Sequence, residues 1–186
     1  MNYTDIFKTD TTNGVGVRVV LWTSGCSHHC KDCHNPQTWS PTHGKPFTND
    51  TVNEILEAMD KSYIDGITLS GGDPLYKGNL KDIYNLILTI KEKLPTKTIW
   101  IYSGFTWEEL HSQQDEDTIL RKQIVELCDI FVDGKFELEK KNIRLKYCGS
   151  ENQKVINVQE TLKNNKIILF NWKETDYYVQ FTKYQI

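Results

Sequence analysis

The sequence predicts an α/β fold with a parallel sheet, and three observations support this prediction. Strand-like and helix-like segments alternate about four times along the chain, which is typical of βαβ units. The chain has 186 residues, which favours one main domain with a sizeable core. A closed eight-stranded barrel usually needs about 250 residues, more than this chain provides. We therefore expect an open, partial βα barrel.

Each element is predicted from its residue pattern: strands from runs of β-branched and aromatic residues, helices from apolar residues at helical spacing. Capping boxes of Thr51 with Glu54 and of Thr106 with Glu109 would mark two helix starts, and Pro95 marks a helix end. In chain order the segments alternate between strand and helix: 15–24, 48–62, 65–72, 79–94, 97–104, 117–128 and 129–135.

The C-terminal part of the chain is irregular. After "VINV" (155–158) the periodic pattern lapses into "QETLKNNK". Two further strand-like stretches, "IILF" and "DYYVQF", lie on either side of "NWKET" and suggest a hairpin. We therefore expect a main domain at 1–158 and an extension at 159–186, in which the β-hairpin packs on the same domain.

The composition excludes several broad classes of protein. The net charge is −3 and the isoelectric point is near 6.0, which argues against a surface that coats nucleic acid. No run approaches 18 apolar residues, so we expect no membrane span. The start, "MNYTDIFKTD", lacks the basic and apolar regions of a signal peptide. We expect a cytoplasmic protein, in which five cysteines indicate metal or redox chemistry rather than disulfides.

Four unusual segments follow predicted strands: the cysteine-rich loop "GCSHHCKDC", then "SGGDP", "YSG" and "VDGK". Ligands of parallel α/β sheets bind at the carboxyl ends of the strands. Because these four segments fall at such ends, we expect them to meet on one face of the molecule.

The cysteine-rich loop predicts a metal centre, and two kinds remain open. Cys26, Cys30, Cys33 and His34 offer the four sulfur and nitrogen ligands of a structural zinc site. Zinc sites of this kind usually combine two separated pairs of ligands, and His34 directly follows Cys33, which makes ligation by both awkward. The alternative is a 4Fe–4S cluster, in which each thiolate binds one corner and the fourth iron stays open for a substrate.

Other cysteines and histidines are given plainer roles. Cys128 lies at a predicted helix end, where a buried cysteine behaves as a small apolar residue, and Cys148 lies beside a glycine. We expect neither to supply a fourth thiolate. His28 and His29, between the first two cysteines of the loop, are expected to face solvent.

The spacing Cys-x3-Cys-x2-Cys after a first strand resembles the signature of radical S-adenosylmethionine enzymes. The similarity extends over roughly residues 1–158 through "NGVGVRVVLWTSGCSHHCKDCHNPQTW", "LSGGDPLY", "IWIYSGFTWEEL", "FVDGKFE" and "GSENQKVINV". Together these segments resemble the activating proteins of anaerobic (class III) ribonucleotide reductases. Two positions depart from that family's pattern: Val15 stands where a proline is usual and Cys148 where an arginine is common.

The resemblance implies a function. Cys26, Cys30 and Cys33 would hold a 4Fe–4S cluster whose open iron binds S-adenosylmethionine. Reductive cleavage would yield a 5′-deoxyadenosyl radical, which removes a hydrogen from a glycine near the carboxyl terminus of the reductase's large subunit. The electron would come from a flavodoxin-like or ferredoxin-like donor. The alternatives are an activase of another glycyl-radical enzyme, of the pyruvate formate-lyase type, and a small zinc-binding interaction module.

The resemblance also assigns roles at "SGGDP". Gly71, Gly72 and Asp73 would contact the cofactor, with Gly72 nearest the methionine amine. Glycines let the backbone approach a ligand closely at a strand end, which agrees with that role, although an ordinary β-to-α turn would use the same residues.

Five further positions complete the predicted cofactor site. Asp32, Cys33 and His34 would flank the adenine, with His34 stacking on it. Asp133 and Lys135 end a predicted strand on the same face and would touch the cofactor's carboxylate or ribose. A surface turn is the alternative interpretation of those two residues.

Overall fold

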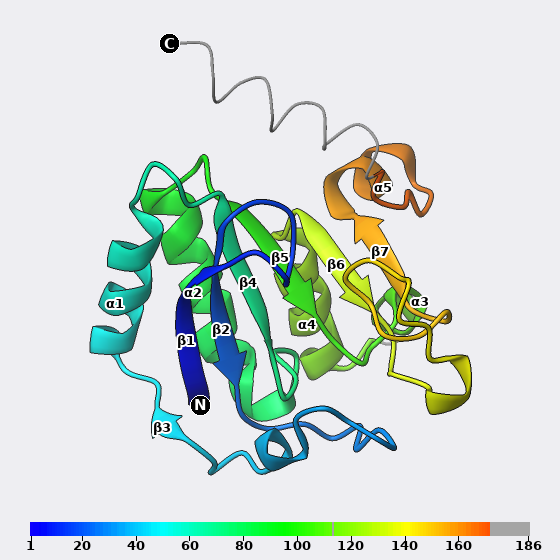
Figure 1. Ribbon diagram of the computed structural model, residues 1–186. Helices are drawn as coiled ribbons and strands as arrows, with labels where there is room; N and C mark the ends of the chain where they lie inside the picture. The colour runs from blue at the N-terminus through cyan, green and yellow to red at the C-terminus, as the bar shows by residue number, and fades with distance from the viewer. Residues whose placement is uncertain (113, 172–186) are drawn as a thin grey trace.

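The computed structural model describes residues 1–112 and 114–171, and these form a single open sheet with helices packed on it (Figure 1). Within the described residues the sheet has seven strands in the order β3-β1-β2-β4-β5-β6-β7. The strands are β1 (Asn2–Asp10), β2 (Arg18–Thr23), β3 (Lys45–Pro46), β4 (Gly66–Gly71), β5 (Thr98–Tyr102), β6 (Ile130–Asp133) and β7 (Lys154–Asn157). The α-helices are α1 (Asn49–Met59), α2 (Leu80–Lys93), α3 (Trp107–Ser112), α4 (Glu116–Glu126) and α5 (Val158–Asn164).

The centre of the sheet is parallel and its edges are antiparallel. Strands β2, β4, β5 and β6 pair in parallel, as the alternation of strands and helices predicts. Strand β1 pairs antiparallel with β2 and with β3, and β7 pairs antiparallel with β6. The mixed α/β class and an unclosed sheet are therefore confirmed, whereas β1 and β3 were not predicted.

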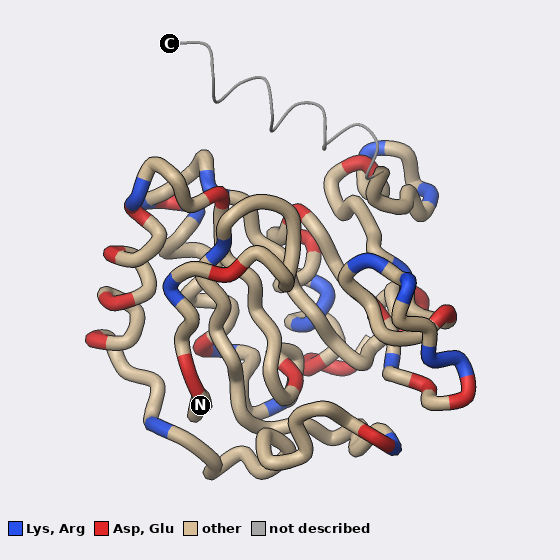
Figure 2. The backbone as a smooth tube through the Cα atoms, viewed as in Figure 1, with Lys and Arg blue, Asp and Glu red and all other residues tan. Residues whose placement is uncertain are grey.

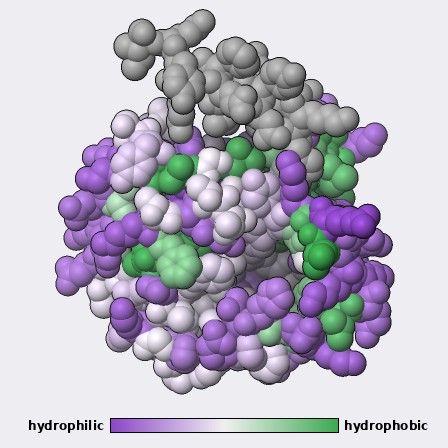
Figure 3. All heavy atoms as spheres, viewed as in Figure 1, coloured by the Kyte–Doolittle hydropathy of each residue, from purple (hydrophilic) through white to green (hydrophobic). Residues whose placement is uncertain are grey.

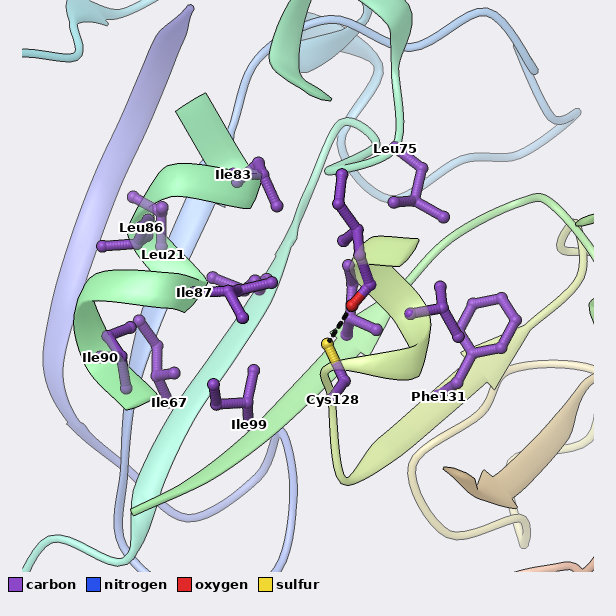
Figure 4. Packing of buried hydrophobic residues seen from close by; sticks show 14 of the residues in the cluster. Leu21, Ile67, Leu75, Ile83, Leu86, Ile87, Ile90, Ile99, Cys128 and Phe131 are labelled. Atoms are coloured by element: carbon purple, nitrogen blue, oxygen red, sulfur yellow. Dashed lines mark hydrogen bonds between the residues drawn. The ribbon is translucent and has the colours of Figure 1, made fainter. Parts of the chain in front are cut away.

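The helices cover one face of the sheet and create the main core there (Figure 4). Alternate side chains of a strand point to opposite faces, so Ile99 and Ile101 of β5 enter this core. Ile87 of α2 is fully buried against them. Trp100, between the two isoleucines, points to the other face and packs in a smaller cluster with Val132.

The N-termini of two helices, α1 and α3, test the predicted capping boxes. The box of Thr106 and Glu109 is confirmed, because the backbone N–H of Thr106 donates to the Glu109 carboxylate at 2.7 Å and that of Glu109 donates to the Thr106 hydroxyl at 3.2 Å. The box predicted from Thr51 and Glu54 is wrong. Helix α1 begins one turn earlier, and Thr48 and Thr51 exchange the capping hydrogen bonds.

The segment that lacked a periodic pattern contains α5. Its first turn is capped by Asn157, whose side-chain oxygen accepts the backbone N–H of Glu160 at 3.1 Å. The predicted strand "IILF" makes one isolated bridge, between Leu169 and Ile156 of β7. The second half of the predicted hairpin, "DYYVQF", lies outside the described residues.

Charge and hydropathy are mixed over the surface. Lys and Arg are interspersed with Asp and Glu along the backbone (Figure 2), and apolar residues on the visible face form small separate groups (Figure 3). Among the helices of the described residues, none combines the length and the apolar character that crossing a membrane requires.

Candidate metal and cofactor site

The cysteine-rich loop leaves the carboxyl end of β2 and is held by backbone hydrogen bonds. The N–H of Gly25 donates to the Thr38 carbonyl at 2.8 Å, and the N–H of Cys26 donates to the Trp39 carbonyl at 3.1 Å. The Gly25 carbonyl in turn accepts the N–H of Asp73 at 2.8 Å. The first cysteine is thus fixed between the end of β4 and the short 3-10 helix Pro36–Trp39, which follows the loop.

A cavity of about 250 Å³ lies between this loop and the carboxyl ends of β4, β5 and β6. All three cysteines of the loop line it, and so do residues of "SGGDP", "YSG" and "VDGK". The four unusual segments of the sequence therefore meet on one face, as predicted. The other lining residues come from the loop and the strand ends and include Ser70, Gly71, Gly72, Tyr102, Ser103, Gly104, Gly134, Lys135, Phe136, Gly149 and Gln153.

The three thiols have the surroundings of ligands that must become thiolates. Burial raises the pKa of the Cys26 and Cys30 thiols above its ordinary value. Backbone N–H groups oppose this effect on the pKa of two thiols: that of His28 lies 3.4 Å from Cys26 Sγ, and that of Phe136 interacts with Cys30. The N–H of Asn35 lies 3.4 Å from Cys33 Sγ. Such N–H···S bonds favour thiolates and tune the potential of iron–sulfur clusters.

The donor set at the cavity bears on which of two kinds of metal centre fits there. Three cysteines of one loop line the cavity. A tetrahedral zinc site needs its ligands around one point. Three separate thiols around a cavity are instead the donor set that fits three corners of a 4Fe–4S cluster.

The two remaining cysteines lie away from the cavity. Cys128 is fully buried in the main core, where its thiol donates to the Ile124 carbonyl at 3.2 Å (Figure 4). Cys148 packs against the cluster around Trp100 on the opposite face of the sheet. Neither belongs to the lining of the cavity.

Comparison with known proteins identifies the family. Residues 12–156 match the protein family described as "4Fe-4S single cluster domain". The anaerobic ribonucleoside-triphosphate reductase-activating protein of Enterobacteria phage T4 is 40% identical over 157 residues, which are 83% of this chain and 93% of the relative. The proteins of the same name from Escherichia coli (strain K12) and Pasteurella multocida (strain Pm70) are each 39% identical, over 83% and 82% of this chain and 97% and 95% of the relatives.

This chain belongs to the family of anaerobic ribonucleoside-triphosphate reductase-activating proteins. The matched range at 12–156 includes the whole cysteine-rich loop and the parallel centre of the sheet. Val15 and Cys148, the two departures from the activating-protein pattern, both pack on the apolar side chains around Trp100. Cys148 therefore has an apolar packing role in this structure.

The two glycines of "SGGDP" line the cavity, but the structure gives them a different reason to be glycine. A Cβ on Gly72 would lie 2.6 Å from the Gly25 carbonyl oxygen and 2.8 Å from that of Thr38. Gly71 has a φ of +107°, and a Cβ there would lie 2.5 Å from the backbone of Thr23. Gly71 is needed so that the end of β4 can adopt a positive φ beside the end of β2, and Gly72 so that the chain after β4 can pack against Gly25 and Thr38.

Two of the predicted cofactor-binding carboxylates are buried and make hydrogen bonds within the protein. Asp73 and Asp133 are buried and face the protein interior instead of the cavity. Asp133 accepts the backbone N–H of Trp107 at 2.9 Å and that of Lys154 at 3.0 Å, and burial raises its pKa. It therefore ties the start of α3 to β7 beside the cavity.

The remaining predicted cofactor contacts line the cavity. Asp32 has a φ of +61° and lies 3.6 Å from the Lys141 ammonium. The ring centroids of His34 and Phe136 are 6.3 Å apart. Lys135 is exposed and follows the end of β6. These three side chains, with Cys33, place ionic and aromatic groups at the edge of the cavity.

Two features of the site were not predicted from the sequence. The expectation that His28 faces solvent is wrong, because its side chain is only 7% exposed and lies against Asp73. The "GSENQ" segment proves to be a support for the loop after β6. Gln153 accepts the N–H of Gly149 at 2.9 Å and donates to the Gly134 carbonyl at 2.8 Å, and Asn152 donates to the carbonyl of Lys135 at 2.8 Å.

Proposed function

We propose that this protein holds a 4Fe–4S cluster through Cys26, Cys30 and Cys33 and uses it to cleave S-adenosylmethionine, generating a glycyl radical on an anaerobic ribonucleotide reductase. The observation that carries the proposal is the convergence of these thiols on one cavity at the strand ends. In this view the open sheet is a partial βα barrel of the radical S-adenosylmethionine type.

When bound, the cluster supplies an electron at low potential and S-adenosylmethionine supplies the carbon radical that takes hydrogen from glycine. The chain's own residues position these groups and limit their contact with water. Cys26 is buried, so it would limit the access of water to a cluster bound there. The N–H groups of His28 and Asn35 stabilise the charge on the thiolates of Cys26 and Cys33.

The lining of the cavity supports specific contacts with the cofactor. In this proposal the backbone at Gly71 and Gly72 binds the methionine amine, with Gly72 nearest. Asp32, Cys33 and His34 flank the adenine, and Lys135 reaches the carboxylate or the ribose. All of these residues line one cavity. Asp73 and Asp133 contribute indirectly by fixing the strand ends beside the cavity, because their carboxylates accept backbone N–H groups of Gly104 and Trp107.

The partners follow from the same proposal. The substrate is a glycine near the carboxyl terminus of the reductase's large subunit, and a flavodoxin-like or ferredoxin-like protein supplies the electron. The electron transfer and the formation of the glycyl radical would both take place in the cytoplasm. Residues 1–158 form the cofactor-binding domain, and residues 159–186 are an extension of it.

The experiment is to reconstitute the chain with iron and sulfide without oxygen, add dithionite and S-adenosylmethionine, and quantify methionine and 5′-deoxyadenosine. The parent should produce both, and replacing Cys26, Cys30 or Cys33 by Ala should abolish production. Cys148→Ala is the matched control and should retain it, because that thiol does not line the cavity. A colourless protein with one zinc per chain would contradict the proposal.

A further inference from the structure

The carboxylate of Asp73 is the centre of a buried set of contacts behind the cavity. Its side chain is 1% exposed. The hydroxyl of Ser103 donates to its two oxygens at 2.8 and 2.9 Å, and the backbone N–H groups of Gly104 and Leu75 donate at 3.1 and 2.8 Å. Asp73 follows β4, whereas Ser103 and Gly104 follow β5, so this carboxylate joins the ends of two neighbouring strands.

His28 brings the cysteine-rich loop to the same carboxylate. Its Nε2 atom lies 2.7 Å from Oδ2 of Asp73. Nε2 is buried and its N–H bond is not well aligned with that oxygen, so the contact is a close polar one rather than an ideal hydrogen bond. The ring of His28 thus links the cysteine-rich loop to this interior carboxylate.

The surroundings of the ring are shaped to receive it. The ring packs edge-on against Phe105, with centroids 4.7 Å apart. A Cβ on Gly104 would lie 2.3 Å from Cδ2 of His28, so the glycine leaves the space that the ring occupies. His29, the next residue, is exposed, and its ring stacks on Trp39 outside this pocket.

We propose that His28 is a positioning residue, whose ring joins the loop carrying Cys26 and Cys30 to the Asp73 carboxylate and so fixes these ligands relative to the ends of β4 and β5. The inference rests on the proposed function for its purpose, because a cluster and its cofactor need cysteines and strand ends held in one arrangement. The ring also lines the cavity, and the role proposed for it is to position the cysteines relative to Asp73.

The chemistry of the contact explains why a histidine serves here. A buried carboxylate that loses a donor is costly, so the ring is retained in its pocket. The backbone N–H of His28 also lies 3.4 Å from Cys26 Sγ, which couples the position of the ring to that of the first thiol. A side chain of similar size without a donor would fill the pocket but lose the polar contact between the loop and the carboxylate, which would keep only its bonds to Ser103, Gly104 and Leu75.

Hydrogen–deuterium exchange of the full chain, without added iron, tests the proposal directly. The probes are the amides of Gly25 and Cys26, which are bound to the Thr38 and Trp39 carbonyls. His28→Leu should accelerate their exchange about tenfold or more, because losing the close polar contact between the ring and the buried carboxylate favours local opening of the loop. His28→Gln, which keeps an N–H donor, should stay within about threefold of the parent.

Controls make each outcome decisive. His29→Leu should leave the exchange rates unchanged, and the amides of Ile99–Ile101 in β5 should exchange slowly in every variant because they lie in the core. Equal exchange in His28→Leu and parent would overturn the proposal. So would equal acceleration in the Leu and Gln variants, or faster exchange throughout β5, since these would indicate packing or global stability instead of the polar contact.

A second readout connects the contact to the cluster. After anaerobic reconstitution, His28→Leu should lose iron to a chelator about tenfold faster than His28→Gln, with parent and His29→Leu as references. Equal rates in the two His28 variants would contradict the inference. Failure of the parent to cleave S-adenosylmethionine would instead contradict the proposed function, and would leave the exchange result unchanged.

Discussion

Gly72→Ala should detach the cysteine-rich loop from the end of β4. The added Cβ would lie 2.6 Å from the Gly25 carbonyl oxygen and 2.8 Å from the Thr38 carbonyl oxygen. Both atoms belong to the backbone and hold the loop in place, because Gly25 N–H donates to that Thr38 carbonyl. The φ of Gly72 is outside the left-handed region, so the steric contact alone opposes the substitution.

The size of the effect follows from overpacking. Forcing a carbon into well-packed surroundings typically destabilises a protein by about 1–3 kcal/mol. Because both clashing atoms belong to the backbone, we expect Gly72→Ala to destabilise the closed loop by about 3 kcal/mol. The clash is relieved when the loop opens, so the free energy of opening the loop should fall by more than the free energy of unfolding the whole chain does. Iron bound per chain should therefore drop well below that of the parent.

The assay combines urea unfolding of the chain with iron and sulfide analysis after anaerobic reconstitution. Gly78→Ala is the matched control, because the nearest atom to its added Cβ is a Tyr76 ring carbon at 3.1 Å, which belongs to a side chain that can move. The control should change the free energy of unfolding by less than about 1 kcal/mol. Parent-like iron content and stability in Gly72→Ala would refute this explanation of the glycine.

Three further predictions follow from the same structure. A Cys128→Ser, Cys148→Ser double variant should keep about four irons per chain, because both thiols lie away from the cavity; loss of iron would mean that one of them is a ligand. Alkylation of the iron-free chain at Cys26 and Cys30 should accelerate steadily from pH 7 to pH 9, because burial raises both thiol pKa values and the thiolate is the reactive form; a rate already constant above pH 7.5 would be inconsistent with this. Arg18→Met should lower the free energy of unfolding by about 3 kcal/mol or more, as measured by urea titration, because it removes five hydrogen bonds made by a buried guanidinium; a loss under about 1 kcal/mol would contradict this.

The parallel centre of the fold could be predicted because its strands and helices carry strong local patterns. Strand β5 is β-branched and aromatic, and α2 repeats apolar residues at helical spacing. Strand β1 has only partly alternating burial and lies at an antiparallel edge, which a βα pattern does not predict. Helix α5 was missed because it has seven residues, and its boundaries depend on the Asn157 cap more than on periodicity.

The site could be predicted where chemistry is carried by residue type and spacing, and less well where it depends on orientation. Three cysteines within eight residues already indicate a metal centre, and the structure brings all three to one cavity. Sequence alone does not tell which way a side chain turns. Asp73 was therefore expected to face the cofactor and His28 the solvent, whereas the two side chains meet in the interior.

The central claim is that three thiols hold a cluster whose remaining iron is open to S-adenosylmethionine. The most direct measurement is the paramagnetic spectrum of the reduced, reconstituted chain before and after addition of S-adenosylmethionine. The account predicts about four irons per chain and a spectrum that changes on addition, because the cofactor binds the cluster itself. A spectrum that stays the same at saturating S-adenosylmethionine, with the cluster intact, would contradict it.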